Sequence, residues 1–306
     1  MRTAYLAAQG FEPQLAAELR RAGVRVVLAH KRLLLADGEA VASAWAANVW
    51  HDAQDVAIES IGDAVRRLRA VQRNWAAYAP LHHRRAALIQ SQLPFLSARK
   101  LVFPMTPPAA PLGSWTLLAP DRLLYAARCA SPFPNGEVGF LEDRKGPPSR
   151  AYLKLWEAFT RLGIWPQPGD LCLDLGATPG GWTWALAKLG ARVIAVDKAP
   201  LDPKVAAMAR VNWREESAFA LDPASLPPIE WLCSDVVCYP ERLLQLVERW
   251  RAAGTVRNFV CTVKFQGDTD HEVAAAFAAI PGSTLFHGHH NKHELTWALL
   301  GAPRGP

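Results

Sequence analysis

Four charged residues stand at or near the ends of predicted strands. Asp174 closes a short apolar run, Asp197 follows a β-branched run, and Asp235 and Lys264 each follow a further apolar run. In open α/β sheets, ligands bind outside the carboxyl ends of the strands. A carboxylate there can hold ribose hydroxyls, and an amine beside a carboxylate can hold or accept a proton. We therefore expect a site at this edge of the sheet.

A glycine-rich turn follows the strand that holds Asp174. The chain runs Asp174-Leu-Gly-Ala-Thr-Pro-Gly-Gly-Trp182 and continues as an apolar, helix-spaced segment. Its glycines let the backbone turn sharply and approach a ligand, while the helix behind presents unpaired N–H groups. The loop lacks the G-x-G-x-x-G spacing of dinucleotide sites, and Asp197, 23 residues after Asp174, is placed to bind a ribose. This pattern favours a cationic, phosphate-free ligand such as S-adenosylmethionine.

The second half of the chain alternates strands and helices in the rhythm of a parallel sheet. We expect helices over residues 150–162, 182–189, 203–209, 241–251 and 271–279, and strands over 171–175, 192–196, 211–213, 231–234, 258–263, 284–287 and 294–299.

The first half predicts a smaller α/β unit. We expect strands at 3–8, 24–29 and 32–35 with a helix at 11–22, mostly helix over 40–90, a proline-rich stretch over 94–120, and short strands at 114–118 and 122–128. Turn-rich sequence near residues 131–149 then suggests a boundary, which we place at residue 145. The predicted domains are 1–145 and 146–306.

The positive charge is confined to the first of these domains. The 306 residues carry a net charge of +6; residues 1–145 hold 18 Lys and Arg against 12 Asp and Glu, and the remainder holds 16 of each. Arginines cluster at Arg66-Arg67-Leu-Arg69, Arg84-Arg85 and Arg99-Lys100. Basic faces of this kind suit a phosphate backbone, because binding releases condensed counterions. The alternative is a set of solvated helix faces.

The composition indicates the cellular location to expect and the state of the cysteines. No apolar run approaches the roughly 20 residues that span a bilayer, and Met1–Gly10 lacks the regions of a signal peptide. We expect a cytoplasmic protein that needs no membrane and no obligatory protein partner. Five scattered cysteines without a CxxC pair are expected to be buried free thiols.

Two motifs resemble a known family. Asp174–Trp182 is similar to the methionine-binding motif of FtsJ-type RNA ribose 2′-O-methyltransferases, and Ser149-Arg-Ala-Tyr-Leu-Lys154-Leu resembles their helix-borne lysine motif. Within that superfamily, Gly10-Phe11-Glu12 and the domain order resemble the RlmM-type 23S rRNA methyltransferases, whose N-terminal, THUMP-bearing region is longer. The resemblance implies a Rossmann-like, S-adenosylmethionine-dependent methyltransferase domain behind a smaller α/β domain that binds RNA, with large-subunit rRNA as substrate.

The resemblance also implies site residues. Those for S-adenosylmethionine are Ser149, Gly176, Thr178, Pro179, Gly180, Gly181, Trp182, Asp197, Glu216 and Asp235. The family's catalytic Lys-Asp-Lys-Glu tetrad falls on Lys154, Asp235, Lys264 and Glu294. Lys264 is the candidate base for the ribose hydroxyl, or else a group that positions the hydroxyl and stabilises developing negative charge.

Other functions stay open. The methyltransferase domain could be catalytically silent in an RNA-binding or assembly protein, or the enzyme could act on another RNA or on a base. A nicotinamide-dependent oxidoreductase is disfavoured by the glycine spacing. His289 and His293 have the i,i+4 spacing of helical metal ligands and lie near His287 and His290, but this segment joins two predicted strands. We therefore predict no metal site.

Overall fold

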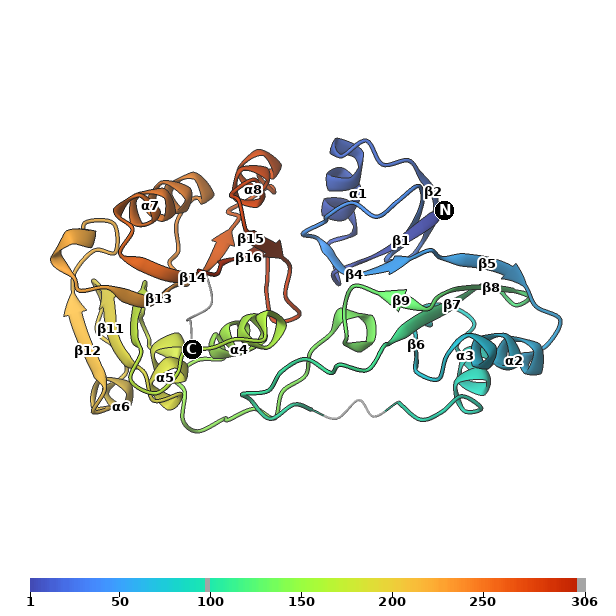
Figure 1. Ribbon diagram of the computed structural model, residues 1–306, viewed down its shortest axis with the longest axis horizontal. Coiled ribbons are helices and arrows are strands. Elements are labelled where there is room, and N and C mark those ends of the chain that lie inside the picture. The colour runs from blue at the N-terminus through green and yellow to red at the C-terminus, as the bar shows by residue number, and fades with distance from the viewer. Residues whose placement is uncertain (97–99, 302–306) are drawn as a thin grey trace. The chain divides into compact units, whose positions relative to one another are not determined.

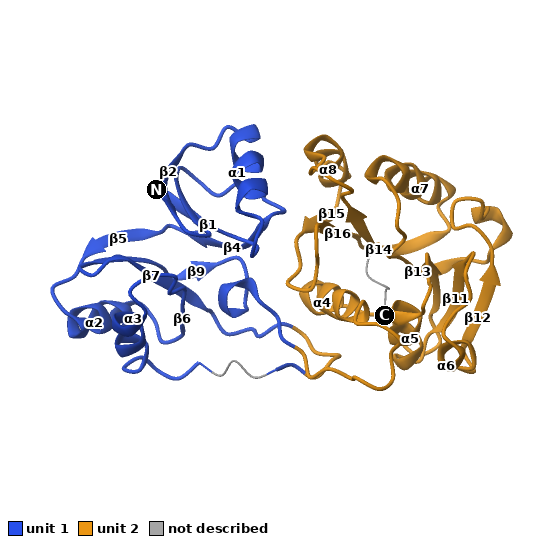
Figure 2. Ribbon diagram, turned by 180° about the vertical axis from the view of Figure 1, so that it is seen from behind, with its two compact units in different colours: residues 1–101, 107–139 blue, residues 102–106, 140–306 orange. Residues whose placement is uncertain are grey.

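A computed structural model of the chain describes residues 1–96 and 100–301. Two compact units divide it: residues 1–101 with 107–139, and residues 102–106 with those from 140 onward (Figure 2). Segment 102–106 belongs to the second unit because Phe103 stacks on Trp156, with 4.9 Å between ring centroids. The expected boundary at residue 145 lies a few residues beyond the observed one. Arg99, named above in a basic cluster, lies outside the described residues.

The second unit contains a seven-stranded sheet in the order β12-β11-β10-β13-β14-β16-β15. Strands β10 to β14 are parallel to one another, and β16 runs antiparallel to both β14 and β15. The strands are β10 (Leu171–Leu175), β11 (Arg192–Asp197), β12 (Val211–Glu215), β13 (Ile229–Ser234), β14 (Val256–Lys264), β15 (Ser283–Phe286) and β16 (Glu294–Leu299). This architecture confirms the predicted Rossmann-like fold class.

Helices cover both faces of this sheet (Figure 1). Helices α4 and α5 lie on one face, and α7 and α8 lie on the other. The helices are α4 (Tyr152–Leu162), α5 (Gly181–Lys188), α6 (Pro203–Ala206), α7 (Pro240–Ala253) and α8 (His271–Ala278). Strands covered on both faces are apolar without alternation, which explains why β10, β13 and β14 are almost wholly buried.

Helix boundaries in this unit follow local chemistry. Asp270 caps α8 by accepting a hydrogen bond from the N–H of Val273, and Asp202 caps the short α6 through Lys204. Gly163 ends α4 in a left-handed conformation, with φ of 70°. Side-chain caps and left-handed glycines of this kind fix where a helix begins or ends.

The first unit holds two sheets. One has the order β2-β3-β1-β4-β9 and the other β5-β8-β7-β6. The strands are β1 (Arg2–Ala7), β2 (Val26–His30), β3 (Leu33–Asp37), β4 (Ala46–His51), β5 (Gln54–Ala57), β6 (Trp75–Ala77), β7 (Gly113–Ala119), β8 (Arg122–Ala126) and β9 (Arg128–Cys129). The helices are α1 (Glu12–Arg21), α2 (Ile61–Val71) and α3 (His83–Gln90). Helices α2 and α3 pack on β7 and β8 around Trp75 and Trp115, which are fully buried.

The prediction of mostly helix over residues 40–90 is wrong for part of that range. Strands β4, β5 and β6 lie there beside α2 and α3. Tertiary pairing decides β4: its Val49 pairs with Tyr5 of β1, and Trp50 is buried in the core. Tryptophan and alanine spacing alone does not reveal such pairing.

Within the described residues, helices of sufficient length and apolarity to cross a membrane are absent. All five cysteines are free; four are buried, and Cys129 is half-buried.

Gly176 tests how tightly the loop after β10 is built. Its φ is +80°, and a Cβ there would lie 2.6 Å from the backbone Cα of Val236. Gly176→Ala should lower the free energy of unfolding by more than the roughly 1–3 kcal/mol of left-handed strain alone. Gly169→Ala is the matched control, because Gly169 also has positive φ but open space around it. Urea unfolding that gives equal losses for both variants would contradict the close approach.

Candidate active site

The structure brings Lys154, Asp235, Lys264 and Glu294 together as one ion cluster. Asp235 is at its centre: its Oδ1 lies 2.7 Å from Nζ of Lys154 and 3.0 Å from Nζ of Lys264. Lys154 also donates to Oδ2 of Asp235 at 2.9 Å and lies 3.0 Å from Oε1 of Glu294. The four side chains are at most 17% exposed. Four residues separated by up to 140 positions thus share one partly buried polar site.

Three neighbouring strands and one helix position this cluster. Asp235 directly follows β13, and Lys264 ends the adjacent β14, so both leave the sheet at its carboxyl edge. The antiparallel strand β16 enters at the same edge, and its first residue, Glu294, pairs in register with Lys264. Lys154 reaches the cluster from the first turn of α4.

The charges of Lys154 and Asp235 stabilise each other. Burial lowers the pKa of Lys154, but the carboxylates of Asp235 and Glu294 outweigh it, and the net pKa lies above the usual value. Burial likewise raises the pKa of Asp235, but Lys154 and Lys264 outweigh it and hold the net pKa below its usual value. Lys154 is therefore an ammonium and Asp235 a carboxylate at neutral pH.

Hydrogen-bond capacity separates the two lysines. Lys154 faces three acceptor atoms, the two carboxylate oxygens of Asp235 and Oε1 of Glu294. Three acceptors use all three N–H groups of an ammonium. In the described part of the chain, Nζ of Lys264 has two acceptors, the Oδ1 and the backbone oxygen of Asp235. One tetrahedral position on its Nζ is therefore left for a ligand.

A residue that sequence reasoning missed completes the cluster. Thr262 donates its hydroxyl to Oδ1 of Asp235 at 2.6 Å. It stands two residues before Lys264 on β14, and residues i and i+2 of a strand point to the same face. That alternation was the available signal.

The glycine loop is held by Asp197. The carboxylate of Asp197 accepts from the backbone N–H of Thr178 at 3.0 Å and of Ala199 at 3.1 Å. The hydroxyl of Thr178 donates to the carbonyl of Ala199 at 2.6 Å. Asp197 thus fixes the loop backbone, and its remaining lone pairs are available to a ribose hydroxyl.

Glycines let the loop lie close to its neighbours. A Cβ on Gly181 would lie 2.6 Å from Oγ of Ser149, and one on Gly180 would lie 3.0 Å from Val205. Ser149 therefore adjoins the first turn of α5, where backbone N–H groups are unpaired. Ser149 also lines a hollow of about 450 Å³, together with residues 142–144, 147–148, 150 and 152.

The other predicted cofactor residues differ in their surroundings. Glu216 follows β12, and its backbone N–H donates to the carbonyl of Asp197 at 3.2 Å. It is half-buried and lies beside the end of β11. The indole of Trp182 is buried and donates to the carbonyl of Ala151 at 2.9 Å. This contact gives the Trp182 side chain a packing role at the start of α4.

Asp174 is a buried carboxyl behind the loop. Burial raises its pKa to about 7, the charges of Asp235 and Asp197 act in the same direction, and a hydrogen bond from Thr183 opposes them. Thr183 donates to Oδ2 at 2.6 Å, while Oδ1 has no hydrogen-bond partner among the described residues. Burying a neutral carboxylic acid in this position costs less free energy than burying a carboxylate.

The histidines of residues 287–293 make separate contacts. His287 contacts the carbonyl of Lys292 at 2.9 Å, and His293 contacts the hydroxyl of Thr269 at 2.7 Å. Burial lowers the pKa of His287 to about 4, so its ring is neutral. His290 packs against Phe140. Across the described ranges, the structure holds no group of three or more His, Cys, Asp or Glu arranged for a metal.

Comparison with known proteins shows that part of the chain is similar to one protein family. Residues 147–269 match the model of the FtsJ-like methyltransferase family. This finding confirms the family expected from the two motifs.

Curated relatives named ribosomal RNA large subunit methyltransferase M are similar to part of this chain. They include the ribosomal RNA large subunit methyltransferase M of Methylococcus capsulatus, which is 37% identical over 175 residues, 56% of this chain and 46% of the relative. The protein of that name from Azoarcus sp. is 37% identical over 45% of this chain and 38% of its own. That of Aromatoleum aromaticum is 41% identical over 38% of this chain and 33% of its own. The chain thus spans less than half the length of each of these relatives.

The raised pKa of Asp174 predicts how stability depends on pH. The folded state binds more protons than the unfolded state between the ordinary pKa of 3.8 and the folded value of about 7. The free energy of unfolding should therefore fall as pH rises through this window, by up to about 1.4 kcal/mol per pH unit from this group. Asp174→Asn should flatten the fall, as measured by urea unfolding at several pH values.

The exposed Asp121 provides the control. In Asp121→Asn, the free energy of unfolding should fall with pH as steeply as in the unaltered protein. A slope unchanged in Asp174→Asn would contradict the protonated, buried state of Asp174.

Proposed function

We propose that the protein transfers a methyl group from S-adenosylmethionine to a ribose 2′-hydroxyl of RNA, with the 23S rRNA of the large ribosomal subunit as substrate. One observation carries the proposal: the Lys154–Asp235–Lys264–Glu294 cluster lies at the sheet edge where the glycine loop also ends. The FtsJ-like match and the large-subunit methyltransferase relatives support it. An intact cluster disfavours a silent domain.

The donor would lie along the loop between β10 and α5. Ser149, Gly176, Thr178, Pro179, Gly180 and Gly181 would form its walls, Asp197 would bind the ribose, and Glu216 would lie toward the adenine. The sulfonium of the bound donor makes its methyl carbon electrophilic. Glycines at positions 180 and 181 leave the room that side chains would otherwise fill.

The lysines would divide the acid–base work. With S-adenosylmethionine bound, the ribose hydroxyl would accept the methyl group and would have to give up its proton to a side chain of the cluster. As a neutral amine, Lys264 would have two N–H groups, which would donate to Oδ1 and to the backbone oxygen of Asp235. Its one lone pair could then accept the hydroxyl proton. Lys154, whose three N–H groups are all used, would orient Asp235 and Glu294.

Charge supports this division. With both lysines protonated, the cluster of two cations and two carboxylates is neutral. With Lys264 as a free amine, the cluster would carry one negative charge, which would favour a cationic donor. Taking up the hydroxyl proton on Lys264 would return the cluster to neutrality.

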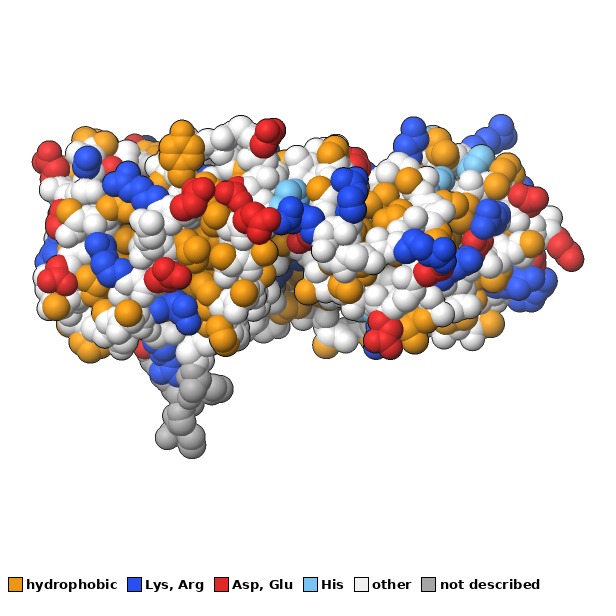
Figure 3. Space-filling view, turned by 90° about the horizontal axis from the view of Figure 1, so that it is seen from above, with side chains coloured by type: hydrophobic (Ala, Val, Ile, Leu, Met, Phe, Trp, Pro, Cys, Tyr) orange, Lys and Arg blue, Asp and Glu red, His pale blue; other side chains and the backbone are white. Residues whose placement is uncertain are grey.

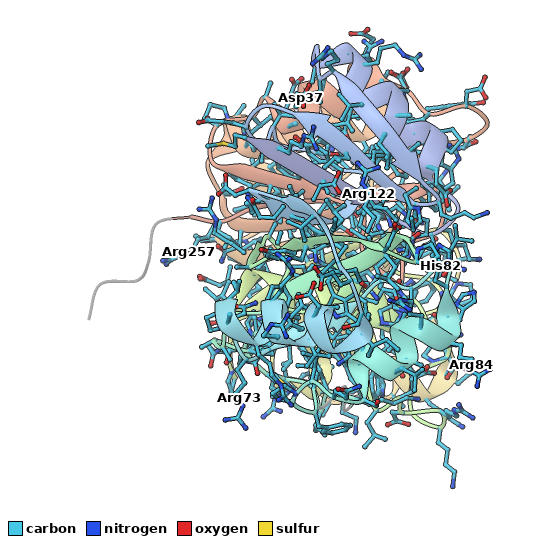
Figure 4. The ribbon with its side chains drawn as sticks, turned by 90° about the vertical axis from the view of Figure 1, so that its right-hand side faces the viewer. Asp37, Arg73, His82, Arg84, Arg122 and Arg257 are labelled. Carbon is cyan, nitrogen blue, oxygen red and sulfur yellow. The ribbon has the colours of Figure 1, made fainter. Side chains whose placement is uncertain are left out.

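The first unit would hold the RNA. Arg66, Arg67, Arg69, Arg73 and Arg84 are exposed on or beside α2 and α3, and we call this the α2–α3 surface. Asp63 pairs with Arg66 and Arg67, but Arg73 and Arg84 point outward into solvent (Figure 4). On the face shown in Figure 3, by contrast, basic and acidic side chains are interspersed. A protein with this substrate would work in the cytoplasm.

Lys264→Arg tests the base most sharply. Arginine keeps the positive charge but cannot give up a proton in proteins, so methyl transfer to 23S rRNA transcribed in vitro should fall at least 100-fold, as in Lys264→Ala. The dissociation constant for S-adenosylmethionine, measured by calorimetry, should change less than threefold. Lys204→Ala, an exposed lysine on α6, should behave as wild type. Near-normal turnover by Lys264→Arg would rule out Lys264 as the base.

Charge reversal tests the α2–α3 surface. Arg73→Glu combined with Arg84→Glu should weaken binding to the same RNA roughly tenfold or more. The plot of log affinity against log salt should become shallower by about 2, because each phosphate contact contributes about 0.9. Arg20→Glu with Arg25→Glu makes the same charge change elsewhere in the unit. Equal losses for the two pairs would show a general charge effect and contradict a defined RNA surface.

A further inference from the structure

A second buried carboxylate lies one helical turn from the ion cluster and takes no part in it. Glu157 follows Lys154 by three positions on α4, so the two side chains share a face of the helix. Glu157 is 1% exposed. An acid so buried needs strong partners, because an uncompensated charge in the interior costs several kcal/mol.

Its partners are two consecutive backbone N–H groups and one arginine. Oε1 of Glu157 accepts from the N–H of His289 at 2.8 Å, and Oε2 accepts from the N–H of His290 at 3.0 Å. Arg161, one turn further along α4, donates to Oε1 at 2.8 Å. Burial raises the pKa of Glu157, but Arg161, His290 and these N–H groups outweigh it, and the net pKa lies below the usual value. Glu157 is therefore ionised.

The two N–H groups belong to residues 287–293, which we call the histidine loop. This loop joins β15 to β16 and leads directly into Glu294. Asn291 connects its two ends: its backbone N–H donates to Gly288 at 3.1 Å, and its side chain donates to the carbonyl of Glu294 at 3.2 Å. The N–H of Lys292 approaches Oε1 of Glu294 at 3.3 Å. A hydrogen-bonded path thus runs from Glu157 to Glu294.

We propose that Glu157 is a positioning residue that anchors the histidine loop to α4 and thereby fixes Glu294 against Lys154. Helix α4 then holds Glu294 twice, directly through Lys154 and indirectly through Glu157. Both contacts come from one rigid helix, so the distance between Lys154 and Glu294 is set by the helix. The inference deepens the proposed function and rests on it for its catalytic part.

Close packing supports an anchor at this place. Gly288 adjoins both the anchor and the loop: a Cβ there would lie 2.8 Å from Oδ1 of Asn291 and 3.0 Å from Oε2 of Glu157. His289 and Lys292 are exposed at the tip of the loop. The anchored loop therefore has a buried base and a polar tip beside the proposed active site.

Glu157→Gln tests the anchor without changing side-chain size. A glutamine offers one carbonyl oxygen, so it can serve at most one of the two loop N–H groups well. Hydrogen exchange at the amides of residues 289 and 290 should accelerate at least tenfold, while amides of β10 and β13 keep their rates. With 23S rRNA transcribed in vitro, kcat should fall at least tenfold, and both KM and the dissociation constant for S-adenosylmethionine should stay within twofold.

Glu230→Gln is the control. Glu230 is half-buried and pairs with Arg257 at 3.3 Å, but it lies at the start of β13, away from the carboxyl edge. Its loss removes an ion pair and should leave kcat and loop exchange unchanged. If Glu157 had only a structural role, Glu157→Gln and Glu230→Gln would show the same kcat and the same loop exchange per folded molecule.

Gly288→Ala disturbs the same contact from the loop side and serves if Glu157→Gln does not fold. It should also lower kcat and accelerate exchange at residues 289 and 290. Unchanged exchange, or accelerated exchange with wild-type kcat, would overturn the proposal. Hydrogen exchange can be measured without turnover. If the wild-type protein methylated no RNA, the proposed function would be wrong, but the exchange rates would still show whether Glu157 anchors the loop.

Discussion

The carboxylate of Asp235, shared between Lys154 and Lys264, is the interaction on which the rest of the site depends. Two lysines this close repel each other, and each loses hydration in a partly buried position. Oδ1 of Asp235 contacts both ammonium groups and also accepts the hydroxyl hydrogen bond of Thr262. Removing it would leave two buried cations with a single remaining acid, Glu294. The cluster can therefore exist only where three strands and a helix converge.

The fold supplies that convergence. Parallel strands β13 and β14 deliver Asp235 and Lys264 to one edge, and the antiparallel β16 brings Glu294 in from the opposite direction in register with Lys264. A parallel strand at this position would have placed its first residue at the far edge of the sheet. Because β16 runs antiparallel to β14, Glu294 at the start of β16 lies at the same sheet edge as Lys264 at the end of β14.

Much of this could be predicted from sequence. Apolar runs ending in Asp197, Asp235 and Lys264 predicted the edge, and the glycine loop predicted the turn into α5, because these signals are local. The strands over 46–57 could not be predicted, since pairing with β1 decides β4 and pairing with β8 decides β5. The roles of Glu157 and Thr183 were equally hidden, because their partners lie at residues 289–290 and at Asp174. Side chains that contact distant backbone leave little trace in local spacing.

The most direct test is the identity of the methylated nucleoside. The protein would be incubated with 23S rRNA transcribed in vitro and S-adenosylmethionine bearing a deuterated methyl group, and the RNA then digested to nucleosides for mass spectrometry. The ion cluster at the sheet edge predicts deuterium in a 2′-O-methylnucleoside, with the label on the sugar fragment. Label on a base fragment, or an absence of label in RNA that the protein binds, would contradict ribose methylation.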